Sequence, residues 1–538
     1  MDESGTGTGT GGITRAELLK AAAVAAPGLL LGRTAAAAAA SSTGPSRRPP
    51  RTRGIRGMNV LLFLTDQQRA IQHFPRGWSR RNLPGMTRLQ EHGMLFENAF
   101  TNACMCSPAR STLMSGYFPA QHGVKYTLEQ DMPAPQYPQV ELSTRFKNLA
   151  SVSLAAGYVP VYKGKFHCNK PAAGSDWVPE DVNKYGFTRW DPPDAGADQS
   201  IPEEGGGIYD NDGRFMNSEG TAKAGTEGAV QYLRDTAARS QPFFMVVSLV
   251  NPHDVLFYPS SYVAGGYDDN WLDGEIGLPA TVNEDLSTKP TVQAQFRRIF
   301  NLTGPIPTPE MKRNYLNFYG NLMKVSDEYL VKILNTLEDG GLLDNTLVVA
   351  TADHGEMGTA HGGLRQKNFN FYEETTRIPL VYSNPRLFPR PQTNRSIVSH
   401  VDFLPTLASL LDVPARARAD WQGVDYSDQI LCRSARPPQS YTVFTYDDWQ
   451  SGQASGPYPQ PPNHIVSIRE HRYKIARYYD ADCKVPPQWE MYDLKTDPLE
   501  RTNLAYKGYR RTARQEREYK RLRRKLARVE RTRLQPLS

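Results

Sequence analysis

The chain has 538 residues, of which 39% are hydrophobic and 10% aromatic, enough for a large core and for more than one domain. Five cysteines in this length exclude the disulfide framework on which small secreted folds depend. The net charge is +7, but residues 506–538 hold 13 Lys and Arg against three Glu, so that segment carries +10 and the remainder −3. Because the remainder of the chain carries a small negative charge, a nucleic-acid-binding surface across it is excluded.

The first 56 residues have the pattern of an export segment. Residues 1–40 contain a few cations, an Ala- and Leu-rich stretch and then small residues, which is typical of a cleaved signal. The stretch is too short, and too interrupted by Pro27 and Gly28, for a stable membrane span. RAELLK at 15–20 resembles a twin-arginine signal with Ala16 in place of the second arginine, so the general secretory route and a cytoplasmic location are the alternatives. Residues 41–56 have the composition of a disordered linker.

Four short apolar runs predict buried strands that end in polar residues. They lie within residues 58–68, 157–167, 242–254 and 345–356, and helical patterns such as that of 309–341 occur between them. This alternation predicts an α/β domain with a large, mostly parallel central sheet and helices on both faces. Ligands of such sheets bind beyond the carboxyl ends of the strands. Those ends carry the polar residues Asp66, Lys165, His167, His253, Asp353 and His354.

Residues 104–116, CMCSPARSTLMSG, place two cysteines in front of a predicted helix. Pro108 suits the first turn of a helix, so Cys106 is expected at the N-terminus, where the dipole favours an anion. By this reasoning Cys106 is a candidate low-pKa thiolate. No Cys-His-Asn arrangement of a thiol hydrolase is evident beside it.

The run from Cys106 to Arg110, with Leu113 and Gly116, resembles the C-x-P-x-R signature of the type I sulfatases, which belong to the alkaline-phosphatase-like superfamily. Other family motifs are matched in the same order by 65–68 (TDQQ), 157–167, 251–254 (NPHD), 353–356 (DHGE), 366–380, 399–413 and 489–504. The resemblance covers roughly residues 58–505. It implies a sulfatase catalytic domain over 57–430.

The C-terminal part predicts two further elements. Alternating segments within 431–505 predict antiparallel strands and resemble the small sheet that completes the sulfatase fold. Residues 506–538 predict a basic amphipathic helix, because Leu522, Leu526 and Val529 recur at helical spacing. We expect that helix to pack on its own domain, with docking on an acidic surface as the alternative.

The resemblance implies a modified residue and a metal. Cys106 would be oxidised to formylglycine (3-oxoalanine) by a formylglycine-generating enzyme, leaving Cys104 as a structural cysteine. The metal would be Ca²⁺, or another divalent cation such as Mg²⁺. Its expected ligands are Asp66, Gln67, Cys106, Asp353 and His354.

The resemblance also implies hydrolysis of aryl or carbohydrate sulfate monoesters. One hydroxyl of the hydrated aldehyde at residue 106 would attack sulfur and expel the alcohol, and His167 would deprotonate the second hydroxyl so that sulfate leaves. Arg110 and Lys165 would hold the diol and its metal. Sulfate binding and protonation of the departing alcohol are expected from His253 and Lys367, and Lys165 is a further expected substrate contact.

Two other functions stay open. A phosphodiester or phosphonate monoester hydrolase of the same superfamily is one, because the pairs Asp66–Gln67 and Asp353–His354 are reminiscent of such enzymes. The other is a non-catalytic protein that binds anions and keeps Cys106 as a thiol. His361 is expected either to line the pocket or to serve its loop.

Overall fold

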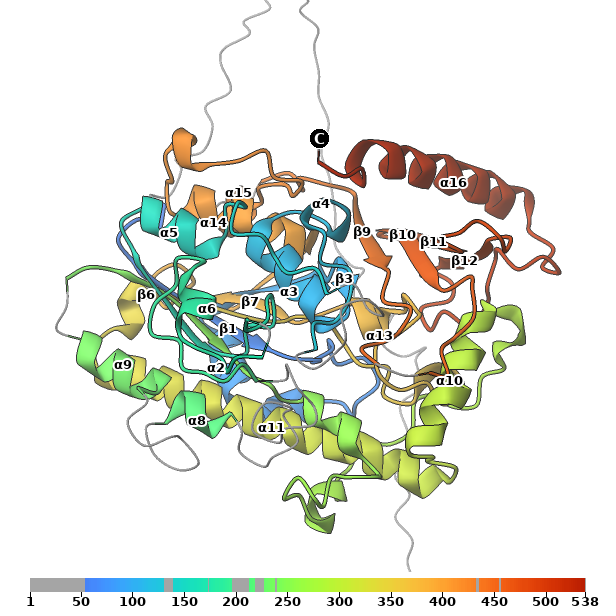
Figure 1. The fold of residues 1–538 in the computed structure, drawn as a ribbon, viewed down its shortest axis with the longest axis horizontal. Helices are drawn as coiled ribbons and strands as arrows, with labels where there is room; N and C mark the ends of the chain where they lie inside the picture. Colours follow the sequence, from blue (N-terminus) through green and yellow to red (C-terminus); the bar gives the residue numbers. More distant parts are fainter. Residues whose placement is uncertain are drawn as a thin grey trace, which may run out of the picture. The chain divides into compact units, whose positions relative to one another are not determined.

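The computed structural model describes residues 54–129, 139–172, 174–195, 212–217, 227–237, 240–431, 435–453 and 456–537. The predicted export segment 1–40 and nearly all of the linker 41–56 lie outside these residues and stay predictions. Within the described part there are two β-sheets, and helices cover both faces of the larger one (Figure 1). No helix of the described ranges is long and apolar enough to span a membrane.

The central sheet has seven strands in the order β4-β5-β1-β6-β7-β2-β8. These are β1 (Asn59–Thr65), β2 (Gly93–Phe100), β4 (Val159–Gly164), β5 (Phe243–Ser248), β6 (Thr346–Ala352), β7 (Leu380–Ser383) and β8 (Gln392–Ser399). Neighbouring strands pair in parallel except at β7, which runs antiparallel to β6 and β2. The predicted mostly parallel sheet is therefore confirmed, and its four predicted strands are β1, β4, β5 and β6.

Alternate residues of β1 pack on opposite faces of the central sheet, as strand geometry requires. Leu61 and Phe63 belong to the cluster that contains the long helix α11 (Pro309–Asp339) and α9 (Ala229–Thr236). Leu62 and Leu64 belong to the cluster that contains α3 (Cys106–Ser115), α5 (Leu149–Ala155) and α14 (Phe403–Leu410). Burial on both faces explains why β1 is a continuous apolar run.

Shorter helices connect these layers. They are α1 (Trp78–Asn82), α2 (Pro84–Glu91), α4 (Pro119–His122), α6 (Glu180–Asn183), α8 (Gly213–Met216), α10 (Thr291–Thr303), α12 (Ala360–Gly363), α13 (Glu373–Thr376) and α15 (Ser427–Leu431), with 3₁₀ turns at His253–Phe257, Asp269–Leu272, Leu286–Thr288, Leu343–Asn345, His400–Asp402 and Ala415–Ala417.

The second sheet has the order β12-β11-β10-β9-β3. Its strands are β9 (Tyr441–Tyr446), β10 (His464–Glu470), β11 (Tyr473–Tyr479), β12 (Gln488–Asp493) and the short β3 (Ala103–Cys104). The four C-terminal strands pair antiparallel, which confirms the predicted small sheet. β3 joins its edge in parallel with β9, so the segment just before Cys106 belongs to the C-terminal sheet.

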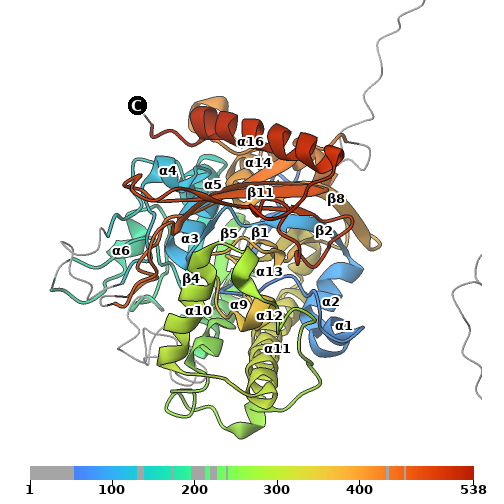
Figure 2. The same cartoon turned by 90° about the vertical axis from the view of Figure 1, so that its right-hand side faces the viewer.

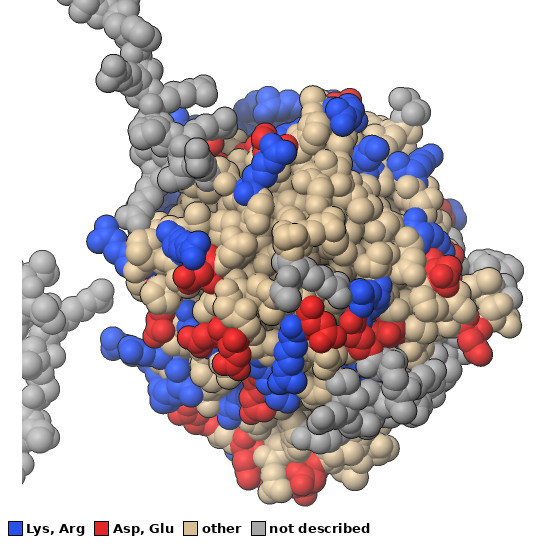
Figure 3. Space-filling view, turned by 90° about the vertical axis from the view of Figure 1, so that its left-hand side faces the viewer, with Lys and Arg blue, Asp and Glu red and all other residues tan. Residues whose placement is uncertain are grey.

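Helix α16 (Ala513–Arg533) lies along the outer side of the second sheet (Figures 1 and 2). Leu522, Leu526 and Val529 are buried in one cluster with residues of β9, β10, β11 and β12. The predicted amphipathic helix thus packs on its own domain. On the face of the molecule shown in Figure 3, basic and acidic side chains are interspersed, as the small net charge of the body suggests.

Candidate active site

Cys106 opens helix α3, of which every residue is buried. Its Sγ lies 3.2 Å from His354 Nε2 and 3.5 Å from Asp66 Oδ1. Burial and the Asp66 carboxylate raise the pKa of the Cys106 thiol to about 12. The interpretation of Cys106 as a low-pKa thiolate is therefore wrong for this arrangement, because desolvation and nearby carboxylates outweigh the helix dipole.

Two carboxylates and two cations form a buried charge cluster beside the sulfur. Arg110 donates from Nε to Asp353 Oδ2 at 2.9 Å and from Nη2 to Asp66 Oδ2 at 3.1 Å. Lys165 Nζ lies 2.7 Å from Asp66 Oδ2. Burial tends to raise the pKa of Asp66, but Lys165 and the other positive neighbours hold it well below its ordinary value. Burial and the charge of Asp66 raise the pKa of Asp353, as expected for two carboxylates that share a site.

Four side chains of this cluster could hold a metal ion. Ligand atoms of Asp66, Cys106, Asp353 and His354 all lie within 4.8 Å of one another. The main-chain N–H groups of Gln67 and His354 donate to Asp353 Oδ1 at 2.9 and 2.8 Å, which fixes that carboxylate. Burial lowers the pKa of His354, so its imidazole is neutral and can act as a ligand. Buried carboxylates clustered with a neutral imidazole suit a divalent cation.

The Gln67 side chain bonds to a neighbouring set of polar groups. Its Nε2 donates to Glu356 Oε2 at 2.6 Å, and its Oε1 accepts from Lys367 Nζ at 2.5 Å. Tyr315 donates to the other oxygen of Glu356 at 2.8 Å. Gln67 as a metal ligand stays a prediction, since its amide oxygen is engaged by Lys367 in this structure.

His167 presents an unpartnered ring nitrogen. Its Nε2 lies 2.6 Å from the carbonyl of Leu128, and because a carbonyl only accepts, Nε2 carries the proton and Nδ1 the lone pair. Nδ1 is buried without a hydrogen-bond partner among the described residues. Asp194 accepts from the main-chain N–H groups of Phe166 and His167 at 2.7 and 2.6 Å. Burial and Lys165 lower the pKa of His167, so the ring is neutral.

His253 and Lys367 lie at the wall of a cavity of about 430 Å³. Its other walls combine apolar and aromatic groups with amides, among them Met105, Tyr258, Phe296, Phe300, Tyr458, Asn368 and Gln450. The Nδ1 atom of His253 is buried and has no hydrogen-bond partner in the described ranges. Burial, with Lys367 as the largest electrostatic contribution, lowers the pKa of His253. The cavity thus joins the polar cluster to a space suited to an organic group.

His361 lies in a different cluster. Its Nδ1 lies 2.7 Å from Glu284 Oε2, its Nε2 lies 3.6 Å from Glu374 Oε2, and its ring stacks on Tyr372 with centroids 3.6 Å apart. Ligand atoms of His361, Glu374 and Glu500 are also grouped, but Lys474 Nζ lies 2.8 Å from Glu500 Oε1 and supplies a counter-charge. His361 is not among the residues that line the cavity, which favours the loop interpretation.

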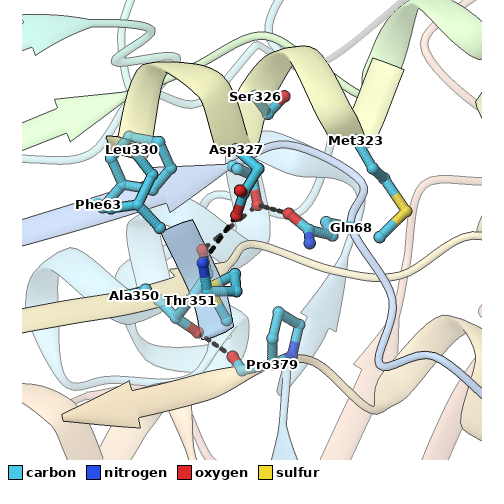
Figure 4. A pocket seen from close by; sticks show the side chains of 11 residues that line it. Phe63, Gln68, Met323, Ser326, Asp327, Leu330, Ala350, Thr351 and Pro379 are labelled. Atoms are coloured by element: carbon cyan, nitrogen blue, oxygen red, sulfur yellow. Dashed lines mark hydrogen bonds between the residues drawn. The ribbon is translucent and has the colours of Figure 1, made fainter. Parts of the chain in front are cut away.

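A much smaller void lies between α11 and the central sheet (Figure 4). Its volume is about 10 Å³, room for one water at most. Asp327, which borders it, accepts from the main-chain N–H groups of Gly85 and Met86 at 2.6 and 2.8 Å. The void is therefore a packing feature at the start of α2 and has no room for a substrate.

Sequence reasoning missed three supporting groups. Glu356 lies inside the DHGE segment, so a signal for it existed. Ser248 ends β5 and accepts from Arg110 Nη1 at 2.7 Å, and Asp194 holds the backbone before and at His167. A lone Ser or Asp after an apolar run or in a long loop carries no local pattern that marks such a contact.

Comparison with known proteins identifies the class. A family model described as Sulfatase matches residues 58–413, more than half of the chain, and one described as the C-terminal part of N-sulphoglucosamine sulphohydrolase matches residues 361–531. The chain belongs to the sulfatase family. It is a hydrolase of sulfate esters, as the resemblance of its motifs predicted.

Named relatives extend over most of the chain. Arylsulfatase K of Xenopus laevis is 26% identical over 79% of this chain and 74% of its own length. The N-acetylglucosamine-6-O-sulfatase of Bacteroides thetaiotaomicron is 23% identical over 83% and 82%. A solved 2-O GAG sulfatase has a TM-score of 0.65 at 20% identity, covering 89% of this chain and 93% of that one. The phosphonate monoester hydrolase of Agrobacterium radiobacter has a TM-score of 0.63 at 20% identity, covering 88% and 96%. These two structures share the fold.

Proposed function

We propose that this sulfatase cleaves aryl or carbohydrate sulfate monoesters with a formylglycine made from Cys106 and a bound divalent cation. The observation that carries the proposal is the position of Cys106. It lies beside Asp66 and His354, and the Asp66 carboxylate is held by Arg110 and Lys165. A buried thiol whose pKa is raised is a poor nucleophile as it stands, whereas a hydrated aldehyde offers two hydroxyls, one to attack sulfur and one to let sulfate leave.

The donor set supports a cation held by Asp66, Asp353, His354 and residue 106. Two carboxylates would favour Ca²⁺ or Mg²⁺, and the imidazole also suits a transition metal. When bound, such a cation polarises a sulfate oxygen and stabilises developing negative charge. Arg110 contributes by fixing both carboxylates in one orientation, and Lys165 neutralises Asp66 when no metal is present.

The remaining polar residues suit the proton transfers. The free Nδ1 lone pair of His167 can accept a proton from a hydroxyl at residue 106. The ammonium group of Lys367 can bind sulfate oxygens from its position at the cavity wall. His253 is neutral in the free protein, and the negative charge of a bound sulfate ester would favour its protonated, acid form. It could then protonate the departing alcohol.

The cavity and the relatives support an organic leaving group of moderate size. A volume of about 430 Å³ with aromatic walls accommodates an aryl ring or a sugar residue. A structure similar to this chain is described as a complex with its substrate D-glucosamine-2-N,6-O-disulfate, and a relative is named delta 4,5-hexuronate-2-O-sulfatase. We therefore place carbohydrate sulfates among the first substrates to test.

The test needs the converted enzyme. The full chain is co-expressed with a formylglycine-generating enzyme, and the mass of the peptide containing Cys106 is measured by mass spectrometry. The aldehyde form is expected, together with metal-dependent hydrolysis of nitrophenyl sulfate that Cys106→Ala abolishes. A thiol at residue 106 under these conditions, with no hydrolysis, would favour the anion-binding alternative.

A phosphodiester or phosphonate monoester hydrolase is the second candidate, favoured by the combination of Asp66, Gln67, Asp353 and His354 and by the fold shared with a phosphonate monoester hydrolase. Rates on nitrophenyl sulfate and on a nitrophenyl phosphate diester separate the two. A larger kcat/KM on the diester would reverse the assignment.

Export of the mature protein, proposed from residues 1–40, is tested by fractionating the producing cells.

A further inference from the structure

Helix α16 carries a row of arginines along one side. They recur at alternating steps of three and four residues and are Arg514, Arg517, Arg521, Arg524, Arg528 and Arg531. At 3.6 residues per turn this spacing confines them to an arc of about 100° and spreads them over about 26 Å of helix. We call these six side chains the arginine stripe. The buried residues Leu522, Leu526 and Val529 lie on another side of the helix.

Most of the stripe is not neutralised. Arg521 donates to Glu470 at 2.9 and 2.5 Å. The other five arginines of the stripe are exposed, and within the part of the chain that the structure describes none has a carboxylate oxygen within 4.0 Å.

The three glutamates of the helix do not change this balance. Glu516 pairs with Arg511 and Lys520, and Glu530 pairs with Arg477. Glu518 pairs with Arg521, the one stripe residue that also binds Glu470. The stripe therefore holds an excess of positive charge, unlike the mixed surface of Figure 3.

The stripe also borders a shallow hollow. The described residues that line it all belong to α16 and are Arg521, Arg524, Lys525, Ala527, Arg528 and Arg531. Five of these six residues are cationic, so the hollow is suited to a chain of anionic groups.

We propose that the arginine stripe binds a linear sulfated polysaccharide, the polymer from which the enzyme removes sulfate. This inference rests on the proposed function for the identity of the polymer. Guanidinium groups pair with sulfate and carboxylate oxygens through two parallel N–H donors, and a row of about 26 Å matches an extended chain better than a small anion.

Other polyanions fit less well. A helix that inserts into a membrane surface needs a free apolar face, and that of α16 is buried against the second sheet. Single-stranded nucleic acid is commonly held on aromatic rings between the cations. The one aromatic residue of 514–531, Tyr519, packs against the cluster that holds Leu522 and Leu526 instead of standing among the arginines.

The stripe is separate from the catalytic cluster. One face of the second sheet packs Phe444 and Tyr446 with Met105 beside the nucleophile, whereas Val443 and Val466 pack with α16 on the other face. Figures 1 and 2 show α16 on the outer side of this sheet. The stripe therefore acts on polymer binding and leaves the chemistry at Cys106 unchanged.

The test compares two triple variants of the full-length, converted enzyme. The stripe variant carries Arg524→Gln, Arg528→Gln and Arg531→Gln. The control removes the same charge from exposed arginines that likewise have no carboxylate partner in the described ranges: Arg76→Gln, Arg234→Gln and Arg390→Gln. Binding to dextran sulfate is measured across a salt series, alongside kcat/KM on nitrophenyl sulfate.

The stripe variant is expected to bind dextran sulfate at least about 10-fold more weakly at low salt, with the slope of log affinity against log salt reduced by about 2 to 3. The control should bind like the wild type, and all three proteins should share one kcat/KM on nitrophenyl sulfate. Equal affinity of stripe variant and wild type, or an equal loss in the control, would overturn the proposal.

Two further measurements fix the partner. Tighter binding of the wild type to duplex DNA or to phosphatidylserine vesicles than to dextran sulfate would also overturn it. Stripe-dependent binding of dextran sulfate by a protein that hydrolyses no sulfate ester would support the surface and overturn only the proposed function.

Discussion

Replacing His361 with Gln removes a positive charge that is buried between two glutamates. The imidazole lies between Glu284 and Glu374, with the shorter contact, 2.7 Å, to Glu284. Burial alone would lower the pKa of His361, but these two carboxylates raise it from 6.5 to about 9. Glu374 responds in the opposite sense: its pKa falls to about 2 despite burial, since the His361 imidazolium lies beside it, with Nε2 3.6 Å from Oε2.

The size and sign of the effect follow from linkage. A pKa that rises from 6.5 to about 9 on folding corresponds to about 3 kcal/mol of stability. Because the folded state binds the proton more tightly, that contribution is complete below pH 6.5 and is lost as the pH rises towards about 9. Gln keeps a hydrogen-bonding group but no charge, so His361→Gln should lose the contribution at all pH values.

Urea unfolding of both proteins at about pH 6 and about pH 9.5 measures this difference. We expect a gap in unfolding free energy of about 3 kcal/mol at the lower pH that largely closes at the higher one. His122 provides the opposite control, because burial lowers its pKa to about 3. Below pH 6.5 the unfolded chain binds a proton at His122 and the folded chain does not, so acid lowers the unfolding free energy of the wild type. The difference in unfolding free energy between the wild type and His122→Gln should therefore narrow on acidification. A gap for His361→Gln that is the same at both pH values would refute the reasoning.

Three further outcomes are expected. His253→Ala should slow hydrolysis of sugar sulfates by about 10²–10⁴-fold but that of nitrophenyl sulfate much less, and equal losses on both would count against an acid at this position. Asp353→Asn should bind less than one divalent ion per chain, as measured by atomic emission, and full metal content in the variant would contradict the ligand assignment. A chelator should reversibly abolish the sulfatase activity of the wild type. Leu526→Ala, at a fully buried site in α16, should cost about 2–5 kcal/mol, with an unchanged urea midpoint as the contrary result.

The central sheet and the strand-end residues could be predicted because they depend on local pattern. β1, β5 and β6 are continuous apolar runs that must be buried on both faces, and the ends of parallel strands meet at one edge of the sheet. This geometry brings Asp66 and Asp353 together, although 287 positions separate them along the chain. Gln67 N donates to Asp353 Oδ1 at 2.9 Å as a result.

What could not be predicted depends on contacts between distant segments. The helix N-terminus at Cys106 favours a thiolate, but the competing carboxylate of Asp66 arrives from another strand. The side chain of Gln67 is directed by Glu356 and Lys367, which no spacing in the sequence reveals. The contact of His361 with Glu284 likewise joins residues 77 positions apart.

The second sheet belongs to the candidate active site because of β3. Ala103 and Cys104 pair with Thr445 and Tyr446 of β9, so C-terminal strands fix the backbone just before Cys106. The opposite face of the same sheet packs against α16, and among the described residues the two faces belong to separate clusters. Cys106 itself is only 2% exposed, and its position depends on strands that lie more than 300 residues later in the chain. If Cys106 is modified as proposed, we therefore expect the modifying enzyme to act before the two sheets have packed together.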